Sequence, residues 1–251
     1  MDAKQLFDWV RANQANKRLT LVQVAAINNM LITMSPDFLQ EQLSLLMGWD
    51  VSSSKKLSKA DIIAVANDLN IEPAALKAVI DVEAAGEGFD NQGRPTILFE
   101  PHVFWSELGE INYYTKRAEL AKKHKGLLSP KWDKSLYRIG GSSHDKLKIA
   151  AELNWDAAHK SASWGLGQIL GRNAVSIGYP SVKAFIDDMY ESEAKQLKAM
   201  GMFLKANGLI SKLQRHDWAG FARGYNGSAY AKNQYDVKLA DAYKLAKKQG
   251  W

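Results

Sequence analysis

An apolar helical face that ends in a carboxyl group is the strongest constraint in this sequence. Residues 73–83 place four side chains at helical spacing, so these side chains share one face of a helix. They are Leu76, Val79, Ile80 and Glu83. Gly86 and Gly88 follow closely and predict that the helix ends near Glu83. The sequence therefore predicts a carboxyl group on an apolar face, in the last turn of a helix.

This position favours the protonated form of Glu83. Burial disfavours the charged carboxylate, and the negative end of the helix dipole acts in the same direction. A carboxylic acid that stays neutral near pH 7 can serve as a general acid. The alternative is a salt-bridged or half-exposed glutamate at a helix end, which is common in proteins.

A second carboxylate follows in what we expect to be a small β-hairpin. Residues 90–93 carry a turn signal and residues 96–99 predict a short strand, with Glu100 after it. Glycoside hydrolysis commonly uses two carboxylates, one to protonate the leaving oxygen and one to act on the sugar or on a water. The structural alternative for Glu100 is a bond to backbone amides or to Arg94.

A later segment, residues 161–169, carries glycines and an amide suited to a sugar. Its glycines, Gly167 among them, allow the backbone to approach a ligand closely. Gln168 offers a donor and an acceptor to hydroxyl or N-acetyl groups. Trp164 could stack on a sugar or fill the core, and the core is the default. The alternative for the whole segment is a helix start whose glycines serve packing.

The order of these motifs resembles the lysozyme superfamily. Helix-end glutamate, then Gly-Leu-x-Gln, then Tyr-Asn-Gly is the motif order of soluble lytic transglycosylases and goose-type lysozymes. More specifically, the chain looks like the N-acetylmuramidase family of phage endolysins, from about residue 57 to the C-terminus. The strings that carry this resemblance are Val82–Gly86, Gly93–Glu100, Ser161–Gln168 and Ala222–Gly227.

The resemblance implies a lysozyme-like domain that hydrolyses the β-1,4 bond between N-acetylmuramic acid and N-acetylglucosamine in peptidoglycan. It implies that Tyr225 and Asn226 face Glu83, which makes Tyr225 the candidate to position or tune that carboxyl. Goose-type and transglycosylase relatives manage with one dominant glutamate. A lytic transglycosylase that forms 1,6-anhydro ends is therefore the alternative enzyme, although Glu100 favours hydrolysis.

The amino-acid composition limits the kinds of catalytic and metal-binding site that this chain can form. The 251 residues include no cysteine, which excludes disulfides and thiolate chemistry. The five histidines are scattered without metal-ligand spacing, so we expect neither a metal nor a cofactor. The net charge of +6 suits an acidic cell wall, nucleic acid or anionic lipid without choosing among them.

The sequence shows no targeting signal for secretion or for membrane insertion. The first residues lack the pattern of a secretory signal, and no apolar run approaches the roughly 20 residues that span a bilayer. We therefore expect a monomer without stable membrane insertion that stays in the host cytoplasm. The resemblance implies that a holin-type agent then releases it to the wall.

We expect an α+β fold that is predominantly helical. A lysozyme-like catalytic domain with one small β-hairpin should cover residues 55–251, after a helical N-terminal segment over residues 1–50. The serine-rich stretch 51–54 is the linker candidate. So small a segment cannot bury all its apolar side chains alone, which favours packing on the catalytic domain over binding of the cell wall. Helices are predicted near 3–14, 19–34, 36–47, 58–69, 73–83, 101–125, 143–159, 164–171, 181–206, 209–214, 217–224 and 232–248.

Two functions of other classes fit part of the pattern. Residues 62–80 resemble a helix-turn-helix, but the second helix carries more acidic than basic side chains, which would repel phosphates. We therefore expect no nucleic-acid partner. A non-catalytic wall-binding module would explain the glycines and aromatics, but not an acid on an apolar face.

Overall fold

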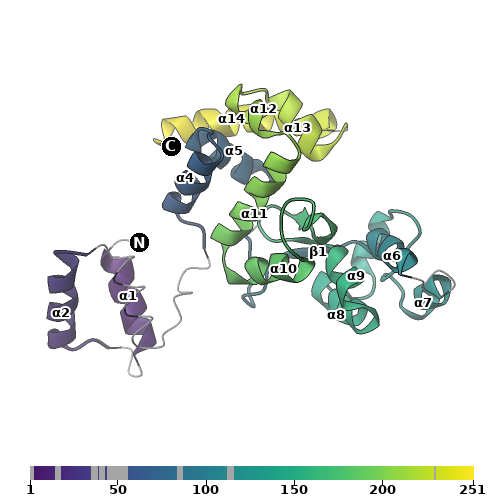
Figure 1. Ribbon diagram of the computed structural model, residues 1–251, viewed down its shortest axis with the longest axis horizontal. Helices are drawn as coiled ribbons and strands as arrows, with labels where there is room; N and C mark the ends of the chain where they lie inside the picture. Colours follow the sequence, from purple (N-terminus) through teal and green to yellow (C-terminus); the bar gives the residue numbers. More distant parts are fainter. Residues whose placement is uncertain are drawn as a thin grey trace. The chain divides into compact units, whose positions relative to one another are not determined.

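Helices make up most of the fold, as the apolar periodicity predicts. The computed structural model (Figure 1) describes residues 3–14, 18–34, 39, 43, 56–83, 87–111, 116–228 and 230–251. The chain divides into two units, Met1–Ser58 and Lys59–Trp251. Among the described residues, no helix is long and apolar enough to cross a membrane.

Among the described residues of the N-terminal unit lie the helices α1 (Ala3–Asn13) and α2 (Leu21–Leu31). Thr20 begins α2 with a capping box, because its hydroxyl accepts the Gln23 N–H while the Gln23 side chain accepts the Thr20 N–H. A small core holds the unit together, made of Leu6, Trp9, Val10, Ile27 and Leu39. Most of the helix expected over 36–47, and the whole of the linker expected over 51–54, lie outside the described residues.

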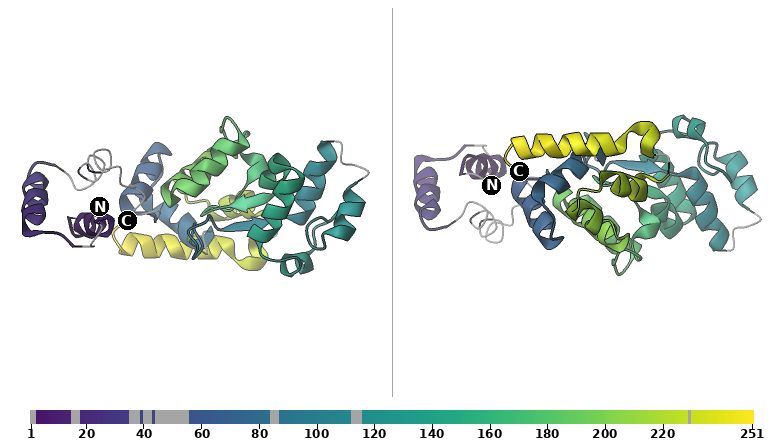
Figure 2. Two further views of the ribbon diagram at one scale, coloured as in Figure 1. Left: turned by 90° about the horizontal axis from the view of Figure 1, so that it is seen from below. Right: turned by 90° about the horizontal axis from the view of Figure 1, so that it is seen from above.

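Five helices of the larger unit form one helical group. They are α4 (Lys59–Asp68), α5 (Pro73–Glu83), α12 (Ile210–Gln214), α13 (Trp218–Asn226) and α14 (Tyr235–Lys248). The last helix packs along α5, although the two are far apart in sequence (Figure 2). Asn70 ends the α4 turn in the left-handed region, at φ 51°, and Pro73 is the first residue of α5. The apolar face of α5 thereby becomes buried, while Glu83 lies at its C-terminal end.

The other group surrounds a small sheet. Its helices are α6 (Pro101–Glu110), α7 (Arg117–Lys123), α8 (Ser143–Leu153), α9 (Trp155–Lys160) and α10 (Val182–Glu191). Helix α11 (Glu193–Ala206) contacts members of both groups. Short 3₁₀ turns complete the unit at Lys134–Arg138 (η2), Gly171–Asn173 (η3) and Tyr230–Asn233 (η4).

The sheet has more strands than the single hairpin that the sequence predicts. It has three antiparallel strands in the order β1 (Ile97–Phe99), β2 (Ala162–Trp164) and β3 (Ile169–Leu170). The expected strand near 96–99 is present, but it pairs with β2, and the turn before it is closed by an isolated Phe89–Pro95 bridge and by backbone hydrogen bonds such as Asp90 N–H to the Arg94 carbonyl. The helix expected near 164–171 is wrong, because this segment forms the β2–β3 hairpin. Its turn needs left-handed backbone at Gly165 (φ 63°) and Gln168 (φ 46°), which a helix cannot contain.

Two long predicted helices are each split in the structure. The helix expected over 143–159 breaks at Asn154, and the one expected over 181–206 breaks at Ser192. Both residues are extended, and each side chain caps the helix that follows by accepting a backbone N–H. Apolar periodicity continues across both breaks, which is why the sequence pattern merged the helices.

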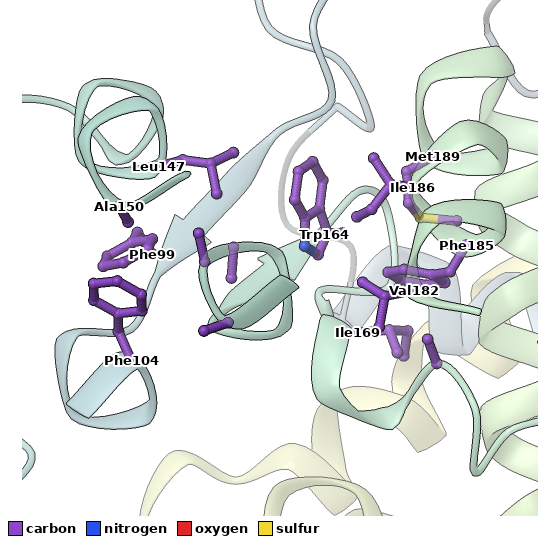
Figure 3. Packing of buried hydrophobic residues seen from close by; sticks show 14 of the residues in the cluster. Phe99, Phe104, Leu147, Ala150, Trp164, Ile169, Val182, Phe185, Ile186 and Met189 are labelled. Atoms are coloured by element: carbon purple, nitrogen blue, oxygen red, sulfur yellow. The ribbon is translucent and has the colours of Figure 1, made fainter. Parts of the chain in front are cut away.

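The main hydrophobic core lies between the sheet and its helices. Phe99 packs edge to face against Phe104, at 5.6 Å between ring centroids, next to Leu147 and Ala150 (Figure 3). Trp164 lies between this group and the α10 side chains in the same view. Strand alternation gives the sheet one buried face and one open face, because Phe99 is fully buried while its neighbour Leu98 is 37% exposed.

We expect the two faces of β1 to differ sharply in their contribution to stability. Phe99→Ala should lower the free energy of unfolding by about 3–5 kcal/mol, because it leaves a cavity in a packed core. Leu98→Ala, one residue away on the open face, should cost roughly 1 kcal/mol or less. Urea unfolding of both variants measures the difference, and similar losses would contradict the assignment of the faces.

Candidate functional site

The Glu83 carboxyl lies where the helical group meets the sheet group. It is half-buried at the end of α5, and its Oε1 accepts a hydrogen bond from Asn226 Nδ2 at 2.8 Å. Asn226 is the last residue of α13, and Gly227 follows with φ 81°. The sequence prediction that Glu83 is an acid on an apolar helix face therefore agrees with its position.

Burial raises the pKa of the Glu83 carboxyl above its ordinary value. The Asn226 hydrogen bond and the positive charge of Lys238 on α14 both oppose this rise in pKa. The C-terminal end of α5 adds a dipole that also disfavours the charged carboxylate. Glu83 is thus a carboxyl group whose environment favours the proton, with one amide that holds its orientation.

Asn226, rather than Tyr225, is the side chain in direct contact with Glu83. The Tyr225 hydroxyl donates to the Gly167 carbonyl at 3.0 Å, and its ring packs against Phe203 and Phe221. Burial raises the pKa of the Tyr225 phenol, and the negative charge of Glu83 raises that pKa further. Tyr225 therefore connects the end of α13 to the glycine-rich turn, and Asn226 orients the carboxyl.

The glycine-rich turn presents Gln168 at the surface. The Gln168 amide nitrogen donates to the carbonyls of Gly165, at 2.9 Å, and Thr96, at 3.3 Å, which orients the whole amide group. Gly167 is buried, and a side chain there would press on Met200. The structure brings Gln168 and Gly167 together with Tyr225 and, through Asn226, with Glu83.

Trp164 does not lie at the surface. It is fully buried, and its indole N–H donates to the His159 carbonyl at 3.1 Å. It belongs to the core between the sheet and α10, so its expected role as a substrate-binding residue is corrected. A tryptophan buries a large apolar area, and that area is used here for packing.

Helix α11 holds two loops of the site with two buried side chains that motif reasoning missed. The Gln196 Oε1 accepts from Leu166 N at 2.8 Å, and its Nε2 donates to Met189 O at 2.8 Å and to Gly88 O at 3.1 Å. Glu193 accepts the Gly88 N–H at 2.8 Å. The loop after α5 and the glycine-rich turn are therefore tied to one helix. Nothing in the local sequence indicates these bonds, because the partners are distant along the chain.

Glu100 has its own polar surroundings at the start of α6. The Tyr137 hydroxyl donates to Glu100 Oε2 in a short hydrogen bond, and His102 Nδ1 lies 3.4 Å from the same oxygen. The suggested pairing of Glu100 with Arg94 is wrong, because Arg94 binds Asp90 at 2.8 Å. Tyr137 was not singled out in the sequence, since it lies in a segment expected to be a loop.

The described residues contain no group of three or more His, Asp or Glu side chains that could hold a metal ion.

The hydrogen bonds of the Gln196 side chain should contribute to activity as well as to stability. Gln196→Leu keeps the volume but leaves buried backbone groups without partners, each costing about 1–3 kcal/mol. We expect a lower melting temperature and slower clearing of a peptidoglycan suspension at a temperature where the variant is still folded. Lys198→Leu, at an exposed position of the same helix, is the control and should leave both unchanged. Full activity in a destabilised Gln196→Leu protein would limit this residue to a structural role.

Known proteins share this fold and these motifs. A family model described as N-acetylmuramidase matches residues 72–247. A search of curated proteins finds no match. Among solved structures, the chain is similar to the Burkholderia AP3 phage endolysin, with 35% sequence identity and a TM-score of 0.68. That similarity covers 82% of this chain and 76% of the endolysin chain. The family match spans most of the larger unit, including Glu83, the glycine-rich turn and Asn226, so this chain belongs to the N-acetylmuramidase family.

Proposed function

We propose that this protein is a glycoside hydrolase that uses Glu83 as the general acid. The family and the similar endolysin support the broader function, a peptidoglycan-degrading muramidase of phage lysis. The proposal that Glu83 is the general acid is supported by the position of its half-buried carboxyl. Burial raises the pKa of this carboxyl, and Asn226 donates a hydrogen bond to its Oε1. The bond to be cleaved is the β-1,4 bond between N-acetylmuramic acid and N-acetylglucosamine.

In this proposal the Glu83 proton passes to the glycosidic oxygen as the bond from that oxygen to the anomeric carbon breaks. The sugar develops oxocarbenium-like positive charge, and a water supplies the new hydroxyl. The Glu83 carboxylate that remains keeps its hydrogen bond from Asn226, which stabilises the product charge. The water loses one proton to a carboxylate as it attacks, and Glu83 regains a proton, from that water or from solvent, before the next turnover.

Glu100 is proposed as the second carboxylate. Tyr137 donates to it, and burial, together with that hydrogen bond and the charge of Glu100, raises the pKa of Tyr137 to about 12. The phenol therefore stays protonated and keeps donating at any pH near neutrality. A carboxylate held in this way suits stabilisation of the cationic sugar or orientation of the water.

The lytic transglycosylase alternative differs only in the second step. There the muramic acid 6-hydroxyl, instead of water, attacks the anomeric carbon and forms a 1,6-anhydro end. Mass spectrometry of digested peptidoglycan distinguishes the two, because hydrolysis consumes one water per cleaved bond and leaves a muramic acid end that is heavier by one water than the 1,6-anhydro end. Reducing-end muramic acid supports our proposal, and anhydro ends would establish the alternative.

Several sequence expectations remain part of this proposal. We propose residues 55–251 as the catalytic domain, with Gln168 and Gly167 on the substrate side, and a monomer that a holin-type agent releases to the wall. A non-catalytic wall-binding module, the alternative from another class, predicts no clearing of peptidoglycan by the wild-type protein.

Glu83→Gln should abolish nearly all lytic activity while it leaves the fold intact. The substitution keeps the shape but removes the transferable proton, so we expect a loss of roughly 10²–10⁴-fold or more. Glu100→Gln should also lower activity, but by no more than Glu83→Gln, because its role is electrostatic. Zymography in a gel that contains peptidoglycan, with circular dichroism as a folding control, measures both. Clear lysis by folded Glu83→Gln would refute the assignment.

Asn226→Ala should move the alkaline limb of the pH–activity profile to higher pH. A general acid works below its own pKa, so activity falls as the pH rises through the pKa of Glu83. The Asn226 hydrogen bond lowers that pKa, and its removal should therefore raise the pKa further. Lys238→Met should shift the limb in the same direction without disturbing a hydrogen bond to Glu83, and by less at high salt. Initial rates of clearing between about pH 4 and 9 provide the test, and a shift to lower pH in either variant would contradict it.

A further inference from the structure

An exposed tryptophan lies beside the second carboxylate, on the segment that connects α7 to α8. Trp132 is 60% exposed, the highest value among the described tryptophans. Its Nε1 donates to the Tyr137 hydroxyl at 3.1 Å, so the polar edge of the ring has a partner while much of the ring stays open. An indole buries a large apolar area when it packs, so an oriented but uncovered one is a candidate contact for a ligand.

Hydrogen bonds with neighbouring elements hold the segment that carries Trp132 in place. The ammonium of Lys146, which is 2% exposed, donates to the Leu136 carbonyl at 2.7 Å. Asp133 caps the η2 turn by accepting the Ser135 N–H at 2.9 Å. The carbonyl of Pro101, next to Glu100, accepts the Ser129 N–H at 3.2 Å. The segment that carries Trp132 is thus attached both to α8 and to the start of α6.

Two hydrogen bonds in series connect the indole to the site. Trp132 donates to Tyr137, and Tyr137 donates to Glu100. The Tyr137 hydroxyl therefore accepts a hydrogen bond from the indole and donates one to the Glu100 carboxylate. Only the Tyr137 side chain separates the indole from that carboxylate. A ligand that reaches Glu100 has this ring as a neighbour.

The open face of the sheet extends from the Gln168 end of β1 to its Glu100 end. Leu98, Ser163 and Leu170 lie opposite one another across the strands, so they share a face, and Leu98 is 37% exposed on it. Gln168 bonds to the carbonyl of Thr96 just before β1, and Glu100 follows β1 at its other end. Alternation along the strand puts Glu100 on the same side as Leu98.

We propose that Trp132 is a stacking platform for a sugar ring of the glycan strand, at a subsite on the Glu100 side of the cleavage point. A pyranose ring has an apolar C–H face, which suits an aromatic ring, and a rim of hydroxyl groups, which suits the neighbouring carboxylate and phenol. Tyr137 is the positioning residue, because its hydroxyl orients both the indole and Glu100. This inference rests on the proposed function, since the ligand is the glycan of peptidoglycan.

Binding without turnover tests the platform separately from catalysis. The probe is peptide-free glycan strands, titrated calorimetrically into the full-length Glu83→Gln protein and into the same protein with Trp132→Ala, Trp132→Phe or Trp155→Ala. We expect Trp132→Ala to weaken binding by about tenfold and Trp132→Phe to restore most of it. Trp155→Ala, which changes an exposed tryptophan on α9, should bind as well as the parent.

Kinetics on the proteins with Glu83 intact provide the second readout. Trp132→Ala should raise KM more than it lowers kcat, whereas Tyr137→Phe should lower kcat as well, because it also removes the donor to Glu100. Unchanged glycan affinity and KM in a folded Trp132→Ala protein would overturn the platform while the proposed function stands. Failure of the wild-type protein to clear peptidoglycan would overturn the proposed function and this inference together.

Discussion

The arrangement of the site depends on one buried amide. Gln196 is 1% exposed, and its side chain holds the backbone of Gly88, in the loop after Glu83, and of Leu166, in the glycine-rich turn. The Gln196 amide adds to the backbone hydrogen bonds of these turns, such as Thr96 N–H to the Gly88 carbonyl at 2.9 Å and Gly165 N–H to the Thr96 carbonyl at 2.8 Å. Together with Glu193, which accepts the Gly88 N–H, Gln196 joins the loop after Glu83 and the turn that carries Gln168 to one helix. Fully satisfied buried amides of this kind favour one arrangement over its neighbours.

The two carboxylates differ because their surroundings differ. Glu83 is desolvated at the C-terminal end of a helix and has one amide donor, so its pKa is raised. Glu100 follows a strand and accepts a hydrogen bond from a phenol, with a histidine nearby. In our proposal the same chemical group therefore serves as proton donor at Glu83 and as negative charge at Glu100. This division of roles follows from the folds of the segments rather than from the residue type.

Many of the secondary structures could be predicted from local pattern. The α5 helix and its end at Glu83 followed from apolar spacing and glycine stops, and the structure confirms them, while α13 ends at Asn226, two residues beyond the predicted end near 224. The segment 164–171 was predicted as a helix because its residues are compatible with a helix start. It forms a hairpin because β1 offers it strand partners, and those come from more than sixty residues earlier. Breaks at Asn154 and Ser192 were also hidden, because a capping residue inside an apolar-periodic run does not change the periodicity.

The sequence by itself determined the type of chemistry, since a glutamate on an apolar helix face, a glycine-rich turn with Gln168 and a terminal Tyr225–Asn226 pair already indicated a lysozyme-like enzyme. It also determined the family, because those motifs occur in a recognisable order. Only the tertiary structure decided which side chains touch: that Asn226 rather than Tyr225 holds Glu83, that Trp164 is core, and that Tyr137 serves Glu100. The physical reason is that spacing along one helix or strand fixes a face, whereas a hydrogen bond between distant segments depends on how all the elements between them pack.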